Sequence, residues 1–124
     1  MTIRQVSKRY GLTQDTLRYY ERVGMIPPVR RTKSGLRDYS EEDCGWVELV
    51  KCMRSAGLPV EVMIEYVRLT RLGDGTISAR RDLLLRQRER LEADRQAIER
   101  TMERLDYKIS RYDVALRTGK LTWD

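Results

Sequence analysis

Histidine is absent from the 124-residue sequence, and cysteine occurs only twice, as Cys44 and Cys52. Without histidine, the acid–base chemistry that enzymes use most often near neutral pH is excluded. A transition-metal site would have to rely on two thiols and on carboxylates. Cys52 as a catalytic nucleophile would need a base, and no carboxylates gather near a pocket motif to supply one. We therefore expect a protein that is not an enzyme and that holds no cofactor or metal.

Long hydrophobic runs are also missing. No apolar stretch is long enough to span a bilayer, and the N-terminal MTIRQVSKRYG lacks the apolar middle of a signal peptide. These absences predict a cytoplasmic protein with no membrane partner, in which Cys44 and Cys52 are reduced thiols. If both cysteines lie on one helix, roughly 12 Å of helical rise separates their backbones, which is too far for a disulfide.

Positive charge is concentrated at one end of the chain. Residues 1–40 hold nine lysines and arginines against three acidic residues, whereas residues 41–124 hold sixteen of each sign. A solvated basic face is the simplest interpretation of a diffuse excess. Confinement of the whole excess to the first third instead favours a surface that binds nucleic acid.

Two short helices are predicted within this basic end. The first covers residues 3–10, with Thr2 as its N-cap, and Gly11 ends it. The second begins after the N-cap Thr13, ends at Gly24 and carries one apolar face, formed by Leu17, Tyr20 and Val23. Two short helices around a glycine turn are typical of a helix-turn-helix.

A short two-stranded wing is expected next, because Pro27 and Pro28 forbid a helix and RRTKSGLR is a polar, basic stretch with Ser34-Gly35 at its tip. A capping box, Ser40 with Asp43, then opens a helix. The apolar stripe expected on that helix is Trp46, Leu49, Val50, Met53 and Ala56. A further helix begins at Pro59, and its expected apolar face is Val60, Ile64 and Val67.

The last third predicts one long helix, since no glycine or proline occurs from about Ile77 to Arg117. Every seventh residue is apolar along one row, which we call the seam: Leu84, Leu91, Ile98, Leu105 and Tyr112. A companion row is apolar only in its second half: Arg88, Arg95, Met102, Ile109 and Leu116. The preceding helices are too short to cover the seam, so the heptad pattern predicts a helix that pairs with a second copy.

The second helix has the residue types that contact DNA. It would present Gln14, Asp15, Thr16 and Arg18 to a groove, with Tyr19 beside the backbone. Tyrosine hydroxyls and arginine guanidinium groups bond phosphate oxygens, and arginine also reads guanine edges. Packing of Tyr19 against the wing is the alternative for that ring, while Tyr20 shares the apolar face and is expected in the core.

Three stretches together resemble the N-terminal domain of the MerR family of transcription regulators: TLRYYERVGMI, the wing ending in GLRDYSEED, and the helix-glycine-helix RSAGLPVEVMIEYV. The resemblance covers nearly the whole chain. It implies a mainly α fold, in which a winged helix-turn-helix domain precedes a long dimerisation helix that forms an antiparallel coiled coil. We expect the DNA-binding domain with its following helix pair at 1–74, the coiled-coil helix at 75–118, and a short tail at 119–124.

The resemblance also implies a mechanism. Each protomer of a homodimer binds one half of a palindromic promoter element, and the active dimer distorts an overlong spacer so that RNA polymerase can use the promoter. This is recognition of DNA shape and deformability. The positions that match the family's DNA contacts are Thr16, Arg18 and Tyr19 on the second helix and Lys33, Arg37 and Tyr39 on or beside the wing.

The class of effector is inferred from the sensing features that the sequence lacks and from Cys52. The sequence stops just past the long helix, so it has no room for the large ligand domain of drug-binding members. It also lacks the cysteines that metal-sensing and iron–sulfur members carry beyond position 52. Cys52 matches the cysteine of the aldehyde- and electrophile-responsive branch, so the resemblance implies a cysteine sensor of aldehyde stress. The alternatives are a buried structural thiol at Cys52, a regulator that responds to a non-covalent small ligand, and a coiled-coil adaptor that does not bind DNA. Cys44 follows three acidic residues and is the poorer candidate.

Overall fold

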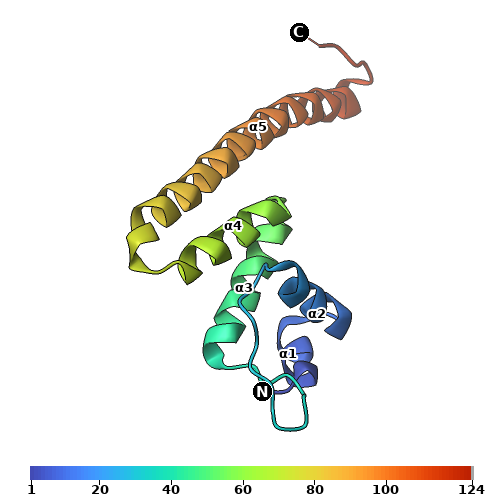
Figure 1. Ribbon diagram of the computed structural model, residues 1–124. Coiled ribbons are helices and arrows are strands. Elements are labelled where there is room, and N and C mark those ends of the chain that lie inside the picture. Colours follow the sequence, from blue (N-terminus) through green and yellow to red (C-terminus); the bar gives the residue numbers. More distant parts are fainter. Residues whose placement is uncertain (124) are drawn as a thin grey trace. The chain divides into compact units, whose positions relative to one another are not determined.

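The computed structural model describes residues 1–123 and is mainly α-helical, as the sequence predicts (Figure 1). By its internal contacts the chain divides into two compact units, Met1–Leu85 and a second that begins at Arg86. No helix in the described part of the chain is both long enough and apolar enough to cross a membrane. Asp124, which the sequence assigned to the tail, lies outside the described residues.

The first two helices begin and end at the residues that their capping chemistry predicts. Helix α1 (Ile3–Tyr10) is capped by Thr2, which forms a capping box with Gln5. Helix α2 (Gln14–Val23) is capped by Thr13, and it ends at Gly24 in the left-handed conformation, with φ of 86°. That conformation costs an L-residue about 1–2 kcal/mol, so glycine is the natural residue there. The predicted helix-turn-helix is therefore confirmed.

Two further helices follow the wing. Helix α3 (Glu41–Ser55) opens with the predicted Ser40–Asp43 capping box, and helix α4 (Val60–Arg71) follows Pro59. A short 3₁₀ helix (Asp74–Thr76) lies between α4 and the long helix.

The buried faces of α3 and α4 differ from the predicted stripes. The buried residues are Cys44, Val47, Val50 and Met53 on α3, and Met63 and Val67 on α4. Trp46 and Leu49 of the predicted stripe are only half-buried, and Ala56 is exposed. Trp46 instead lies at the edge of the core against Tyr66 of α4, with 5.4 Å between ring centroids. A large indole is seldom fully buried, so the smaller Cys44 and Val47 fill the centre.

The first part of the core of the first unit is formed by α1, α2 and the loop that follows α2. Val6 of α1 and Leu17 and Tyr20 of α2 are buried together with the loop after α2, which contributes Met25, Ile26 and Val29. Because this loop is anchored by apolar side chains, it fixes where the wing leaves α2.

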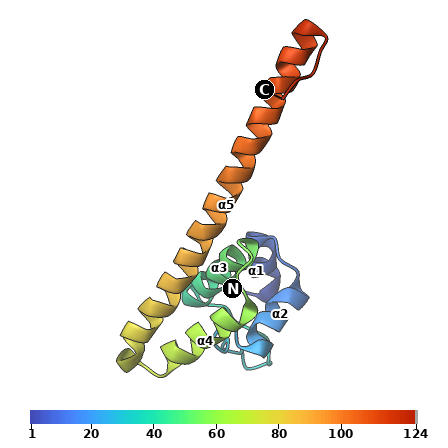
Figure 2. The same cartoon turned by 90° about the horizontal axis from the view of Figure 1, so that it is seen from above.

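Helix α5 (Ile77–Thr118) is 42 residues long, in agreement with the predicted span, and at about 1.5 Å per residue it extends roughly 63 Å. The seam remains uncovered in the single chain: Ile98 is 60%, Leu105 53% and Tyr112 52% exposed. After Gly119, residues 120–123 turn back along the end of the same helix (Figure 2).

Candidate DNA-binding surface

The start of α2 holds the first predicted contact in a fixed position. The Thr13 hydroxyl accepts a hydrogen bond from the Thr16 backbone N–H at 3.0 Å, and it donates to the Thr16 hydroxyl at 2.8 Å. The cap thus orients Thr16 in the first turn of the helix. Backbone N–H groups and hydroxyls at a helix N-terminus are well suited to a phosphate oxygen.

Arg18 lies one turn further along α2 and is partly exposed. Its guanidinium donates to Asp15 Oδ1 at 2.8 Å and to the Gln14 side-chain oxygen at 3.3 Å. Both acceptors are on the same helix, and the Asp15 carboxylate is almost fully exposed. The ion pair contributes little to stability, because exposed pairs are typically worth about 0–1 kcal/mol. It holds the guanidinium extended along the helix, where it can exchange these acceptors for a base edge or a phosphate.

Tyr19 is exposed beside Arg18, whereas Tyr20 is buried as predicted. The Arg22 guanidinium lies 5.5 Å from the centroid of the Tyr19 ring. Tyr19 therefore presents part of its ring together with a neighbouring cation.

The wing is a narrow hairpin with a single antiparallel bridge, between Arg31 and Arg37, rather than two named strands. Thr32 donates its backbone N–H to the Leu36 carbonyl at 2.7 Å, and Gly35 takes φ of 87° in the turn. Lys33 is exposed near the tip of this hairpin.

A hollow of about 280 Å³ lies between α1, α2 and the wing. Its charged lining consists of three arginines, Arg18, Arg31 and Arg37, and Thr2 and Ile3 at the start of α1 complete one side. Three guanidinium groups beside a helix N-terminus make a site suited to an anion such as a DNA backbone phosphate.

Arg37 is placed differently from the prediction that it contacts DNA directly. Its Nε donates to Glu21 Oε1 at 2.6 Å, and the two side chains are only 17% and 14% exposed. Glu21 Oε2 accepts a second hydrogen bond, from the Val29 backbone N–H at 3.0 Å. Glu21 thus links α2, the following loop and the wing. Arg37 mainly supports the wing through this ion pair, and it also borders the hollow.

The pKa of the Glu21 carboxyl is shifted by its burial and by its contacts with Arg37 and Val29. Burial alone would raise the pKa of the Glu21 carboxyl. Hydrogen bonds from Arg37 and the Val29 backbone, together with the charges of Arg37 and Arg31, outweigh burial and hold that pKa below its ordinary value.

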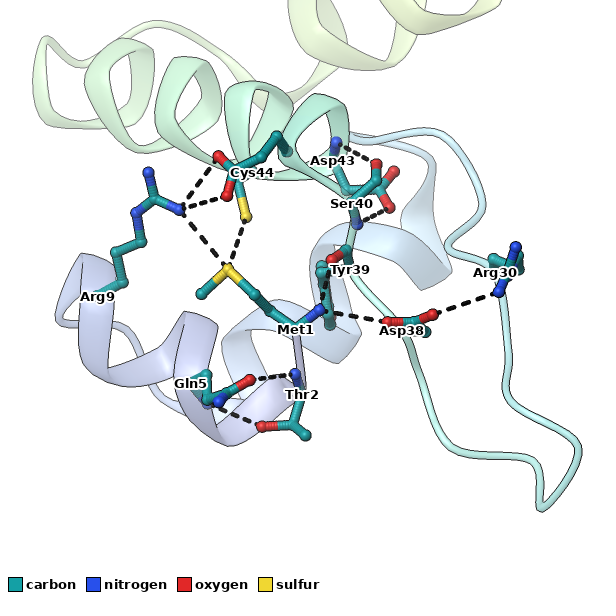
Figure 3. Close-up of polar contacts among 11 residues, drawn as sticks. Met1, Thr2, Gln5, Arg9, Arg30, Asp38, Tyr39, Ser40, Asp43 and Cys44 are labelled. Atoms are coloured by element: carbon teal, nitrogen blue, oxygen red, sulfur yellow. Dashed lines mark hydrogen bonds and ion pairs between the residues drawn. The ribbon is translucent and has the colours of Figure 1, made fainter.

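Tyr39 does not lie where the sequence prediction placed it. The sequence prediction made it a DNA contact, but its side chain is only 2% exposed, and its hydroxyl has no hydrogen-bond partner among the described residues. Figure 3 shows its backbone at the base of the wing, where the Met1 amino group donates to the Tyr39 carbonyl at 2.7 Å and to Asp38 at 3.2 Å. Arg30 approaches the same Asp38 carboxylate at 3.6 Å. Tyr39 therefore anchors the wing from within the core.

Sequence reasoning did not assign roles to Glu21 and Arg31. Glu21 is the one acidic residue in the second half of α2, and it follows the buried Tyr20. This position beside the core could have indicated that Glu21 pairs with a basic residue. Arg31 was counted as a wing cation, but its position beside the hollow depends on the bridge to Arg37.

The two cysteines lie on α3, as predicted, and neither forms a disulfide. Cys44 is buried, with its Sγ 3.9 Å from Met1 Sδ, and Cys52 is exposed. The alternative interpretation of Cys52 as a buried structural thiol is therefore wrong. Within residues 1–123, no three side chains of the His, Cys, Asp and Glu types come together as a metal site.

Comparison with known proteins agrees with this surface. Residues 1–69 match the family model described as MerR HTH family regulatory protein. The chain is 58% identical over 91 residues to the HTH-type transcriptional regulator AdhR of Bacillus subtilis, a match that covers 73% of this chain and 65% of AdhR. The chain thus spans just under two thirds of that relative's length.

Solved structures share the fold over almost the whole chain. A Listeria monocytogenes protein assigned to the MerR family superimposes with a TM-score of 0.92 at 40% identity, covering 96% of this chain and 90% of that one. HiNmlR, a MerR family regulator lacking the sensor domain and bound to promoter DNA, superimposes with a TM-score of 0.83 at 27% identity, covering 96% and 94%. The chain therefore belongs to the MerR family and is a DNA-binding transcription regulator rather than an enzyme.

Proposed function

We propose that this regulator binds a palindromic promoter element as a homodimer and activates transcription by distorting the spacer for RNA polymerase. Each protomer would place α2 in a major groove and the wing along the adjacent backbone. In this scheme residues 1–74 bind DNA, residues 75–118 dimerise and residues 119–124 follow the coiled coil.

The exposed apolar seam on α5 is the observation that supports the proposed dimer. The companion row also favours one orientation of the two helices. In a parallel pair Arg88 and Arg95 would each face their own copy, which places like charges together in the seam. In an antiparallel pair each arginine instead faces an apolar seam residue of the partner helix. The charge pattern therefore supports an antiparallel coiled coil.

We assign direct DNA contact to Thr16, Arg18, Tyr19 and Lys33, which are accessible on α2 and the wing. Arg37 supports this surface through Glu21, and Arg31 joins Arg18 at the hollow of about 280 Å³. A mobility-shift titration on the promoter of the regulator's own operon tests this assignment. Loss of Arg18 should weaken binding, and an adaptor that does not bind DNA would show no shift at all.

For the effector we propose covalent addition of an aldehyde or related electrophile to Cys52. Its thiol is exposed on α3, so a carbonyl compound can reach it. Addition would join sulfur to the carbonyl carbon and leave the thiol proton on the carbonyl oxygen, without oxidation. Because Cys52 and its neighbour Ala56 are both exposed, overpacking of the core is not the route to a switch. The adduct would act by changing the surface of the last turns of α3.

Cys44 is the natural control for this proposal, because it lies on the same helix but is 1% exposed. Exposure to an aldehyde should slow alkylation of Cys52 by iodoacetamide in the Cys44→Ser variant, as followed by mass spectrometry, because the adduct removes the free thiol. A non-covalent effector is the second candidate, supported by a hollow of about 210 Å³ beside Trp46, Leu49 and Tyr66. In that case the Cys52→Ser variant would respond to its inducer normally, and substitution of Trp46 would abolish the response.

A further inference from the structure

The segment that follows α5, residues 119–123, is held against the end of the same helix by several contacts. Arg111 Nε donates to the Thr122 carbonyl at 2.8 Å, and its Nη2 approaches the Thr122 hydroxyl at 2.5 Å. The Tyr107 hydroxyl donates to the Trp123 carbonyl, and Lys108 Nζ lies 4.5 Å from the centroid of the Trp123 ring. We call residues 119–123 the returning segment.

The returning segment brings an indole to the seam. Trp123 packs edge-to-face on Tyr112, the last seam residue, with 5.7 Å between ring centroids. Both rings remain accessible, since Trp123 is 45% and Tyr112 52% exposed. A segment that served only to cap its own helix would bury its largest apolar side chain. This one instead displays that side chain beside an uncovered seam.

Opposite this aromatic pair, an antiparallel partner presents an arginine. Heptad spacing along α5 places Arg81, Arg88 and Arg95 at successive positions of the companion row, and seam residues of one helix face companion residues of the other. If Ile98 faces the partner's Met102, Tyr112 faces the partner's Arg88. If Ile98 instead faces the partner's Arg95, Tyr112 faces the partner's Arg81. Both arrangements pair the ring with a guanidinium.

We propose that Tyr112 and Trp123 form an aromatic clasp for an arginine of the second copy's α5. The proposal rests on the antiparallel dimer proposed above and adds a role for the returning segment. Arginine carries an apolar stem and a planar cation that stacks on aromatic faces, so the clasp offers this side chain a partner within an otherwise apolar seam. The contacts from Arg111 and Tyr107 already order the indole in the single chain, which lowers the entropy lost on pairing.

Two measurements test the clasp. In a Trp46→Phe background Trp123 is the one remaining tryptophan, and its emission should shift to longer wavelength as dilution separates the dimer. Trp123→Ala should weaken dimerisation about 5- to 30-fold by sedimentation, because a symmetric dimer contains the contact twice. Emission that does not change on dissociation, together with unchanged dimer affinity in Trp123→Ala, would overturn the clasp while leaving the dimer intact.

A double-mutant cycle identifies the guanidinium. Trp123→Ala should couple to Arg88→Met or to Arg81→Met, and the matched control Arg95→Met should show no coupling, because it faces the middle of the partner helix. Coupling to none of the three arginines, or equally to all of them, contradicts the assignment. A wild-type chain that is monomeric throughout would instead remove the proposed dimer itself, so the two failures are distinguishable.

Discussion

Glu21→Gln removes one negative charge from the contact between α2 and the wing and leaves an amide of nearly the same size. Glu21 accepts from Arg37 at 2.6 Å and from the Val29 N–H at 3.0 Å. The amide oxygen can keep one of these bonds, but the Arg37 guanidinium loses its counter-charge in a setting where both side chains are mostly buried. Hydrogen bonds to charged groups contribute about 1.5–3 kcal/mol, so we expect the variant to lose stability in that range.

The pH dependence should change as well. The folded pKa of Glu21 is lowered from its ordinary value of 4.5, so the unfolded chain takes up a proton at higher pH than the folded one. The stability contributed by Glu21 is therefore complete above 4.5 and is lost as pH falls through the lower, folded pKa. The gap between wild type and Glu21→Gln should be widest near neutral pH and should narrow below 4.5.

Urea unfolding at neutral and acidic pH measures both effects, and a mobility shift measures the consequence for DNA. Glu48→Gln is the matched control, because Glu48 is exposed on α3 and has no ion pair within residues 1–123. We also expect weaker DNA binding by Glu21→Gln, since the wing would no longer be fixed relative to α2. If the urea midpoints of Glu21→Gln match those of Glu48→Gln at both pH values, Glu21 does not hold the wing.

Three further outcomes are expected. Arg18→Ala should weaken binding to the specific site by about 1–3 kcal/mol if the guanidinium reads a base, whereas Lys33→Ala should weaken binding to all sequences similarly and reduce its salt dependence; a salt titration that shows no effect of either would remove this surface. Replacing Ile98 and Leu105 with glutamate should give monomers by sedimentation, because both side chains lie in the seam, and a double variant that stays dimeric would contradict the seam. Cys52→Ser should bind DNA nearly as wild type does but lose induction by aldehydes in a reporter assay, while Cys44→Ser keeps it, and the reverse pattern would place the sensor elsewhere.

The helices could be predicted from the sequence because their limits are encoded locally. Thr2, Thr13 and Ser40 cap helices through hydrogen bonds to residues three positions later, and Gly24 supplies the left-handed turn that ends α2. Such short-range chemistry needs no knowledge of the rest of the fold.

The surface was predicted less completely, because it depends on contacts between distant residues. Arg37 resembled a DNA contact until Glu21, sixteen positions earlier, was found to hold it. Tyr39 lies in the basic end of the sequence, but its side chain is buried in the core. The buried face of α3 also differs from the predicted stripe, so Cys44 faces inward and Cys52 faces outward. A stripe of apolar residues indicates that a helix has a buried face, but the elements packed against it decide which residues form that face.

Selection of binding sites from random-sequence DNA by the wild-type chain tests the central claim most directly. The claim is that two copies, joined through α5, present two equivalent α2–wing surfaces to DNA. The enriched sites should be inverted repeats with a fixed spacing, and the complex should contain two chains per site. Enrichment of a single half-site bound by one chain, or no enrichment at all, would contradict the account.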